Sequence, residues 1–198
     1  MRAAVHTRYG PPEVVGIAEV ADPVIGDEDV LVRVHATTVN RTDTATRAAR
    51  PWPARLITGL VRPKATILGC EFAGEVEAVG ADVARFAVGD RVFGYNEGPF
   101  GAHAEYLCIP ERGSVAIVPE GWDYEQVAPG TEGSHYALTM LAKAGVGGGD
   151  DVLVYGATGD IGSSAVQLAK SAGARVTAVC ASPHLELVRG LGADRVIE

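Results

Sequence analysis

Apolar and polar positions follow two different patterns along the chain, and the change comes near residue 120. Before that point short apolar runs alternate with turn signals, and the segment 29–39, DVLVRVHATTV, alternates as a strand with one buried face does. Glycines follow one another there at spacings too short for helices. The pattern predicts a compact, partly closed β-barrel over residues 1–120, which opens with a strand from Ala3 to Thr7.

After residue 120 the apolar positions take the helical period, with short buried strands between the helices. Asp123 suits the cap of a short helix, and residues 134–145, SHYALTMLAKAG, have helical periodicity and a glycine stop. The elements expected next are a strand at 152–155, a glycine-rich turn, a helix at 161–172, a strand at 175–180, a helix at 185–191 and a strand at 195–197. This β-α-β-α-β order predicts an α/β domain over residues 121–198 with a parallel, doubly wound sheet.

Charge and composition narrow the class of protein. Seventeen basic and 25 acidic residues give a net charge of −8, which argues against binding to nucleic acid or to an anionic membrane. No apolar run approaches the roughly 18 residues of a membrane span, and the N-terminus lacks the apolar core of a signal peptide. The three cysteines are far apart and odd in number, which argues against a disulfide framework. We therefore expect a reduced, cytoplasmic protein.

One segment is locally basic. Residues 41–64 contain six basic side chains and one acid, Asp43. This segment is either a solvated face that pairs with the acidic remainder, or a rim that attracts an anionic cofactor or substrate. Within it, residues 45–60 are helix-compatible but broken by Pro51 and Pro53, which predicts a lid or side arm.

The strongest chemical signal is the glycine-rich turn in VLVYGATGDIGSSAVQLAK, residues 152–170. A strand that turns abruptly into a helix presents the free amides of the helix start to an anion. Gly159 allows the backbone to approach a diphosphate, Gly162 allows the helix to pack closely on the strand, and Ala157 replaces the first glycine of G-x-G-x-x-G. The predicted cofactor-binding residues of this turn are Gly156, Ala157, Thr158, Gly159, Asp160, Ile161 and Gly162. The alternative is a tight turn without a ligand.

Two further features of the site bear on the cofactor. The carboxylate of Asp160 would repel a diphosphate unless it points outward, so we expect it to point outward or to weaken binding. After the next strand the chain reads VCASPHLE, without the acid that an NAD site needs before Glu186. Ala181 and Ser182 leave room for a 2′-phosphate, and His184 can assist. These residues favour NADP(H) as cofactor, the alternative being a loop that only turns the chain.

With these residues placed, the chain resembles the medium-chain dehydrogenase/reductase superfamily, near the zinc-independent, zeta-crystallin-like quinone oxidoreductases. The resemblance covers the whole chain and rests on MRAAVHTRYGPPEV, VLVRVHATTVNRTD, ILGCEFAGEVEAVG, FAVGDRVFGY, GATGDIGSSAVQLAK and LGADRVI. It implies a GroES-like catalytic β-barrel followed by part of a Rossmann domain, with the active site in the cleft between them.

Where zinc-dependent relatives carry cysteine, histidine and cysteine, this chain has Asn40, Cys70 and about Gly130. Three protein ligands are usual at a catalytic zinc, and the four-cysteine structural zinc lobe is also missing. We expect no metal, and we expect Cys70 to be a buried small hydrophobe. His35, His103 and His135 show no metal-ligand spacing and are expected to be structural.

The resemblance places Asn40 and Asp43 beside the nicotinamide. There Asn40 can donate an amide hydrogen to a substrate oxygen, and Asp43 either orders nearby side chains or caps a helix start. Tyr95 and Thr131 either line the same cleft, Tyr95 as a catalytic and Thr131 as a cofactor-binding residue, or have surface or packing roles.

Together these observations predict hydride transfer from NADPH to a small-molecule substrate, namely a quinone, an enone or a carbonyl compound. An enoyl-thioester reductase and a non-catalytic binding module are the alternatives. After residue 150 only 48 residues remain, fewer than a six-stranded Rossmann sheet needs. We therefore expect a fragment, or a chain completed by a homodimer partner or another complementing chain.

Overall fold

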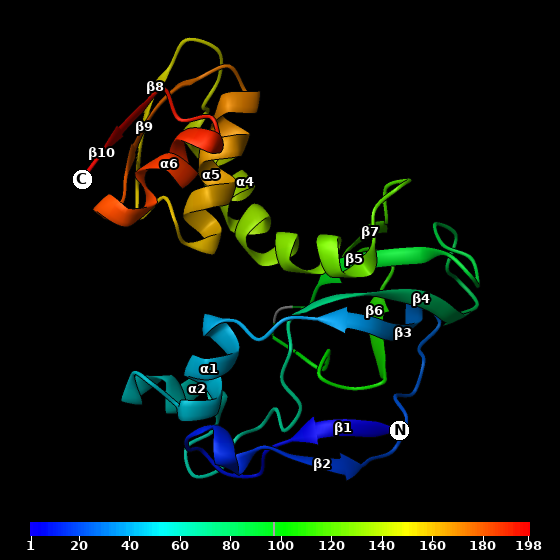
Figure 1. Ribbon diagram of the computed structural model, residues 1–198. Helices are drawn as coiled ribbons and strands as arrows, with labels where there is room; N and C mark the ends of the chain where they lie inside the picture. Colours follow the sequence, from blue (N-terminus) through cyan, green and yellow to red (C-terminus); the bar gives the residue numbers. More distant parts are fainter. Residues whose placement is uncertain (97) are drawn as a thin grey trace. The chain divides into compact units, whose positions relative to one another are not determined.

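The computed structural model describes residues 1–96 and 98–198. It divides into two compact units, Met1–Pro129 and Gly130–Glu198, and each unit is described by itself. Figure 1 shows the order of the helices and strands along the chain. The boundary expected after residue 120 for the functional domains stays a prediction.

The first unit is built on an antiparallel sheet that, over the described residues, has the strand order β6-β3-β4-β5-β7. These strands are β3 (Asp29–Thr37), β4 (Glu71–Val79), β5 (Arg91–Tyr95), β6 (Tyr106–Pro110) and β7 (Ser114–Ile117). A separate hairpin, β1 (Arg2–Val5) and β2 (Gly16–Glu19), carries the first predicted strand. Single bridges from Ala3 to Ala104 and from Val5 to Ile67 join the hairpin to the rest of the unit.

The main sheet curls because β3 and β4 slip out of register. The pairing shifts between Leu31 and Val32, and again between Val34 and Ala36. Such irregularities bend a strand and increase its twist. The sheet folds around a core of buried apolar side chains, half of them valines from the strands: Val30, Val32, Phe72, Val76, Phe86, Val92, Ala102, Leu107, Ile109 and Val115. The partly closed barrel predicted from the sequence is confirmed as a curled antiparallel half-barrel.

Short helices follow the strands of the first unit: α1 (Arg41–Ala48), α2 (Arg55–Thr58) and α3 (Tyr124–Val127). Asp123 caps α3 in a capping box, as the sequence predicts. The expected side arm begins where α1 ends, at Ala49 in the left-handed conformation, and continues through a 3-10 turn at Trp52–Ala54 into α2. The Tyr9 hydroxyl contacts Thr58 Oγ1 at 2.9 Å and donates to the carbonyl of Gly59 at 2.6 Å, which fixes the end of α2.

The second unit is a parallel sheet with the order β10-β9-β8 over its described residues, and helices cover it. Its strands are β8 (Asp151–Tyr155), β9 (Arg175–Val179) and β10 (Arg195–Ile197), and its helices are α4 (Thr131–Ala144), α5 (Asp160–Ser171) and α6 (Leu185–Gly190). Val154, Val166, Val176, Ala178 and Val188 fill its core. The predicted β-α-β-α-β order is confirmed. In the described part of the chain, no helix is long and apolar enough to cross a bilayer.

The cysteines are free thiols in separate surroundings. Cys70 is fully buried in the first unit, and Cys180 is 7% exposed in the second. Cys108 is half-buried in the first unit, where burial raises the pKa of its thiol. Each unit therefore contains one thiol that the folded chain shields.

The buried His6 is the group from which we expect stability to depend on pH. Its ring is 1% exposed, its Nδ1 lies 3.1 Å from the carbonyl oxygen of Thr66, and its Nε2 has no hydrogen-bond partner among the described residues. Burial, with a smaller contribution from the charge of Arg47, lowers the pKa of His6 from its ordinary value of 6.5. The unfolded chain therefore binds the proton more readily than the folded one.

We accordingly expect the free energy of unfolding to be fully retained above pH 6.5 and to fall as the pH drops below it. Urea unfolding at several pH values between 7.5 and 5 measures this slope. His6→Gln, which keeps a donor for Thr66, should flatten it, whereas the same change at the exposed His184 should leave it in place. An equal slope in wild type and His6→Gln would assign the pH dependence to other groups.

Candidate functional site

The glycine-rich turn lies where β8 ends, at the carboxyl edge of the parallel sheet. Gly156 has a φ of +79°, a conformation that side chains disfavour. The amides of Gly156 and Ala157 both donate to the carbonyl of Val179 at the end of β9, at 3.1 Å each. Gly156 thus supplies the sharp turn one position before Ala157, which explains how an alanine can replace the first glycine of the pattern.

Beyond the turn, Gly159 and Gly162 have different surroundings. Gly159 is the N-cap of α5 with extended backbone, φ −75° and ψ 165°, and a Cβ there would meet only the Gly156 carbonyl oxygen, at 3.5 Å. A Cβ on Gly162 would lie 2.2 Å from that same oxygen. Gly162 therefore allows the close contact of helix α5 with the turn after β8, whereas Gly159 leaves open space before the helix. The N-cap residue Gly159 has no side chain and so gives α5 no side-chain cap, and the start of such a helix can face an anion with its backbone amides.

Asp160 lies at the start of α5, next to the start of α4. A Cβ on Gly133 would lie 2.2 Å from Oδ1 of Asp160, so the carboxylate lies directly over Gly133. Asp160 is exposed as a residue, and its side chain is directed toward α4. Thr131 stands two residues before Gly133, at the first position of α4. Thr158 and Ile161 flank the helix start, Thr158 exposed and Ile161 39% exposed.

The predicted ribose-phosphate residues follow β9 at the same edge. Ala181 precedes a 3-10 turn that contains Ser182 and His184, and all three are exposed. The Ser182 hydroxyl donates to the side-chain carboxylate of Glu198, the residue after β10. The sequence motif does not identify this acid, because it covers only the residues that follow β9. The available signal was that neighbouring parallel strands end at one edge, so the residues that follow them meet.

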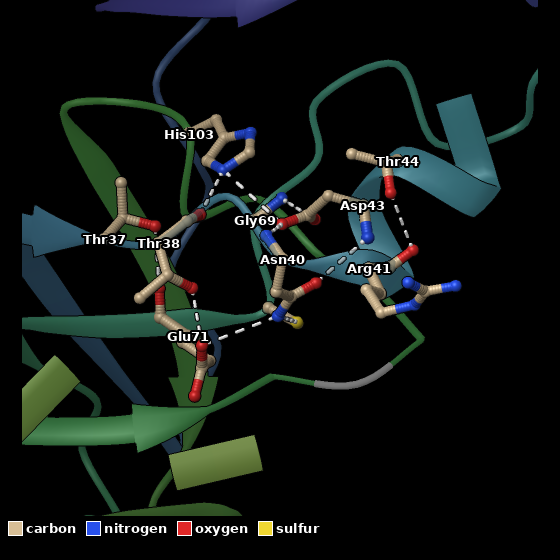
Figure 2. Close-up of polar contacts among 10 residues, drawn as sticks. Thr37, Thr38, Asn40, Arg41, Asp43, Thr44, Gly69, Glu71 and His103 are labelled. Carbon is tan, nitrogen blue, oxygen red and sulfur yellow. Dashed lines mark hydrogen bonds and ion pairs between the residues drawn. The ribbon is translucent and has the colours of Figure 1, made fainter. Parts of the chain in front are cut away.

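In the first unit, Asn40 and Asp43 hold each other at the start of α1 (Figure 2). The Asp43 amide donates to Asn40 Oδ1 and the Asn40 amide donates to Asp43 Oδ2, both at 3.1 Å. Asp43 is only 2% exposed and also accepts from the amide of Gly69 at 2.9 Å. Its carboxylate therefore caps the helix and also ties it to the segment before β4.

The Asn40 side-chain amide points toward β4. Its Nδ2 donates to Cys70 Sγ at 3.1 Å and lies 3.5 Å from Glu71 Oε2. The buried Glu71 also accepts from the Thr38 hydroxyl at 2.5 Å. Tyr95 lies directly opposite Glu71 in the β4–β5 pairing and is 4% exposed. Asn40, Cys70, Glu71 and Tyr95 are thus neighbours, and the catalytic roles of Asn40, Asp43 and Tyr95 stay predictions.

The histidines near this site have structural contacts. His103 Nε2 lies 2.7 Å from the carbonyl oxygen of Thr38 and 3.8 Å from Asp43 Oδ2 (Figure 2). His35 stacks on Tyr124 with ring centroids 4.8 Å apart. Within residues 1–96 and 98–198, no three side chains of His, Cys, Asp or Glu come together as a metal site would require.

Part of the basic segment borders a surface depression. Arg41 and Arg50, both exposed, line a hollow of about 500 Å³ along α1, together with Thr42 and Thr44. Arg41 directly follows Asn40. The hollow is the place in the basic segment where an anionic group would meet two guanidinium groups, and the alternative of a merely solvated face stays open.

Comparison with known proteins gives consistent likenesses. The model of the alcohol dehydrogenase GroES-like domain matches residues 26–120. The chain is 34% identical to a chloroplastic quinone-oxidoreductase homolog of Spinacia oleracea, over 100% of this chain and 61% of that protein. It is 32% identical to the 2-methylene-furan-3-one reductase of Solanum lycopersicum, over 100% of this chain and 52% of that protein. The structure of Escherichia coli quinone oxidoreductase complexed with NADPH matches with a TM-score of 0.81 at 25% identity, over 100% of this chain and 58% of that one.

The chain therefore spans about half to three-fifths of the length of these relatives. The likenesses confirm the expected fold class, a GroES-like barrel followed by a Rossmann-type parallel sheet.

Proposed function

Since the chain belongs to the medium-chain dehydrogenase/reductase superfamily, we propose that it serves an oxidoreductase that transfers hydride from NADPH to a quinone, an enone or a carbonyl compound, without a catalytic metal. The names of the relatives support this class: one is a quinone-oxidoreductase homolog and another reduces a methylene-furanone, itself an enone. The solved relative from Escherichia coli holds NADPH.

The observation that carries the proposal is the open, uncapped start of α5 behind the Gly156 turn. Gly159 keeps the space before the first amides clear of side-chain atoms, and Gly162 brings the helix against the turn. A dinucleotide diphosphate needs such a cradle, because the backbone amides supply both hydrogen bonds and the positive end of the helix dipole. The open space in front of Gly159 and the backbone amides of the helix start fit a diphosphate, and the Asp160 carboxylate is directed toward Gly133 of α4. The bound nicotinamide would supply the hydride, and the protein would supply binding and orientation.

Asn40 is the group that we expect to orient the substrate oxygen. One contact of its amide is Cys70 Sγ, and a thioether or thiol sulfur is a weak acceptor. A substrate oxygen can therefore replace Cys70 Sγ as the acceptor of the Asn40 Nδ2 hydrogen at little cost in free energy. The backbone amide of Asp43 meanwhile donates to Asn40 Oδ1 and holds the side chain in place. This arrangement replaces the polarising metal of zinc-dependent relatives with a hydrogen-bond donor.

A variant at Gly159 tests the proposal without disturbing the fold. The backbone of Gly159 is extended and its surroundings are open, so Gly159→Val should keep the fold, with a loss of about 1 kcal/mol because valine is a poorer N-cap than glycine. Its branched side chain would fill the space in front of the amides and weaken NADPH binding by about tenfold or more. Titration of NADPH fluorescence measures both affinities, and circular dichroism checks the fold.

The matching control is Gly147→Val, where a Cβ has no neighbour within 4 Å and where no cofactor contact is expected. Saturable NADPH binding by wild type that is retained in Gly147→Val and weakened by about tenfold or more in Gly159→Val supports the proposal. Absence of NADPH binding at millimolar concentration, or equal affinities for wild type and Gly159→Val, contradicts it.

A further inference from the structure

The carboxyl edge of the parallel sheet contains an acid that the cofactor assignment has not used. The end of β9 and the end of β10 are neighbours, because Val179 pairs with Ile197 and the Cys180 amide donates to the Ile197 carbonyl at 3.1 Å. The residues that follow the two strands therefore meet. Ser182 donates its hydroxyl to the side-chain carboxylate of Glu198, and both residues are exposed.

This edge is also where the glycine-rich turn is held. The carbonyl of Val179, the last residue of β9, accepts from the amides of Gly156 and Ala157. A dinucleotide whose diphosphate lies on the start of α5 extends its adenosine ribose along this edge toward the end of β9. Ser182 supplies a hydroxyl just after the end of β9, and this hydroxyl donates a hydrogen bond to the negatively charged side chain of Glu198.

A carboxylate at this place acts differently on the two nicotinamide cofactors. It can accept a hydrogen bond from a free ribose 2′-hydroxyl, as the acid of an NAD site does. It repels a 2′-phosphate, and it also holds the Ser182 hydrogen that a phosphate oxygen would need.

We propose that Glu198 is a specificity-determining residue that weakens binding of the 2′-phosphate and so allows NADH to compete with NADPH. The proposal rests on the dinucleotide site of the proposed function. It names an acid that follows β10, whereas the usual acid of an NAD site follows the strand that corresponds to β9. The expectation that the VCASPHLE segment favours NADP(H) is changed accordingly, because Glu198 opposes it.

The test compares the affinities of the chain for NADPH and NADH by fluorescence titration in wild type and in Glu198→Gln. Two charges at exposed positions several ångströms apart interact weakly, so we expect Glu198→Gln to tighten NADPH binding about fivefold. The amide oxygen of glutamine still accepts from a ribose hydroxyl, so the affinity for NADH should stay within about twofold.

Glu186→Gln is the matched control. It removes the same charge from an exposed position of the same unit, where the side chain is paired with Arg189 and makes no contact with Ser182. We expect it to leave the ratio of the two affinities unchanged. The gain from Glu198→Gln should also shrink as salt rises from 0.01 to 0.1 M, since the screening length falls from about 30 to about 10 Å.

The outcomes separate the two proposals. A wild type that binds neither reduced cofactor overturns the proposed function, and this inference with it. If wild type binds them but Glu198→Gln leaves the NADPH to NADH ratio as it was, or raises the affinity for NADH instead, only the role of Glu198 is overturned. A shift of equal size in Glu186→Gln also overturns it, because that shift would reflect net charge alone.

Discussion

Gly162→Ala should lower the free energy of unfolding of the second unit by about 3 kcal/mol and remove measurable NADPH binding. The added Cβ would lie 2.2 Å from the carbonyl oxygen of Gly156 and 2.9 Å from its carbonyl carbon. Both are backbone atoms, so no side chain can rotate away, and helix α5 must separate from the turn. Urea unfolding followed by circular dichroism measures the loss, and NADPH fluorescence measures the binding.

Gly190→Ala is the control for helix glycines. Gly190 is the last residue of α6, its φ is not positive, and a Cβ there meets nothing within 4 Å. Alanine is the better helix former, so stability should stay the same or rise by up to about 1 kcal/mol. Equal stabilities of Gly162→Ala and Gly190→Ala would mean that the close contact between the turn and α5 is not as tight as described. Gly159→Val, by contrast, should fold but bind NADPH poorly. Comparing it with Gly162→Ala separates the role of Gly162 in packing from the role of Gly159 in contacting the cofactor.

Asp43→Ala should lower the free energy of unfolding of the first unit by about 2–4 kcal/mol. The carboxylate is 2% exposed and accepts from the amides of Asn40 and Gly69, so its removal leaves two donors unsatisfied in a buried place. It also frees the start of α1, on which the orientation of Asn40 depends. Thermal and urea unfolding of the variant measure the loss.

Asp82→Ala provides the comparison, because Asp82 is an exposed acid of the same unit. Its removal should change stability by less than about 0.5 kcal/mol. The free energy of unfolding of Asp43→Asn should lie between those of Asp43→Ala and Asp82→Ala, since the amide oxygen can still accept one of the two hydrogen bonds. If Asp43→Ala also changed stability by less than about 0.5 kcal/mol, Asp43 would not be the residue that connects α1 to the segment before β4.

The sequence predicts the second unit well because its signals are local. The sequence predicts the last strand at 195–197, where the structure has it, and α5 begins within one residue of its predicted start. Helix α4 starts at Thr131 and not at residue 134, because apolar periodicity marks the buried stripe and not the first turn. Glycine and capping residues fix such ends more sharply than hydrophobic pattern does.

The candidate site was less predictable, since its contacts join residues far apart in the chain. The sequence leaves open whether Asp43 is a helix cap or an ordering residue. The structure shows its two oxygens accepting from the backbone amides of Asn40 and Gly69, and its role in ordering side chains stays a prediction. The contact of Asn40 with Cys70 spans 30 positions and depends on how β3 and β4 pair. The hydrogen bond between Ser182 and Glu198 depends on the order of the parallel strands, which a motif centred on one turn does not include.

The positions of the buried thiols allow the opening rate of each unit to be measured separately. Cys70 and Cys180 lie in different units and react with an alkylating reagent only while their own unit is open. Mass spectrometry of the modified peptides can therefore time the opening of each unit separately, in one sample and without an attached dye. Such a time course would show which of the two units opens first when a dinucleotide is added.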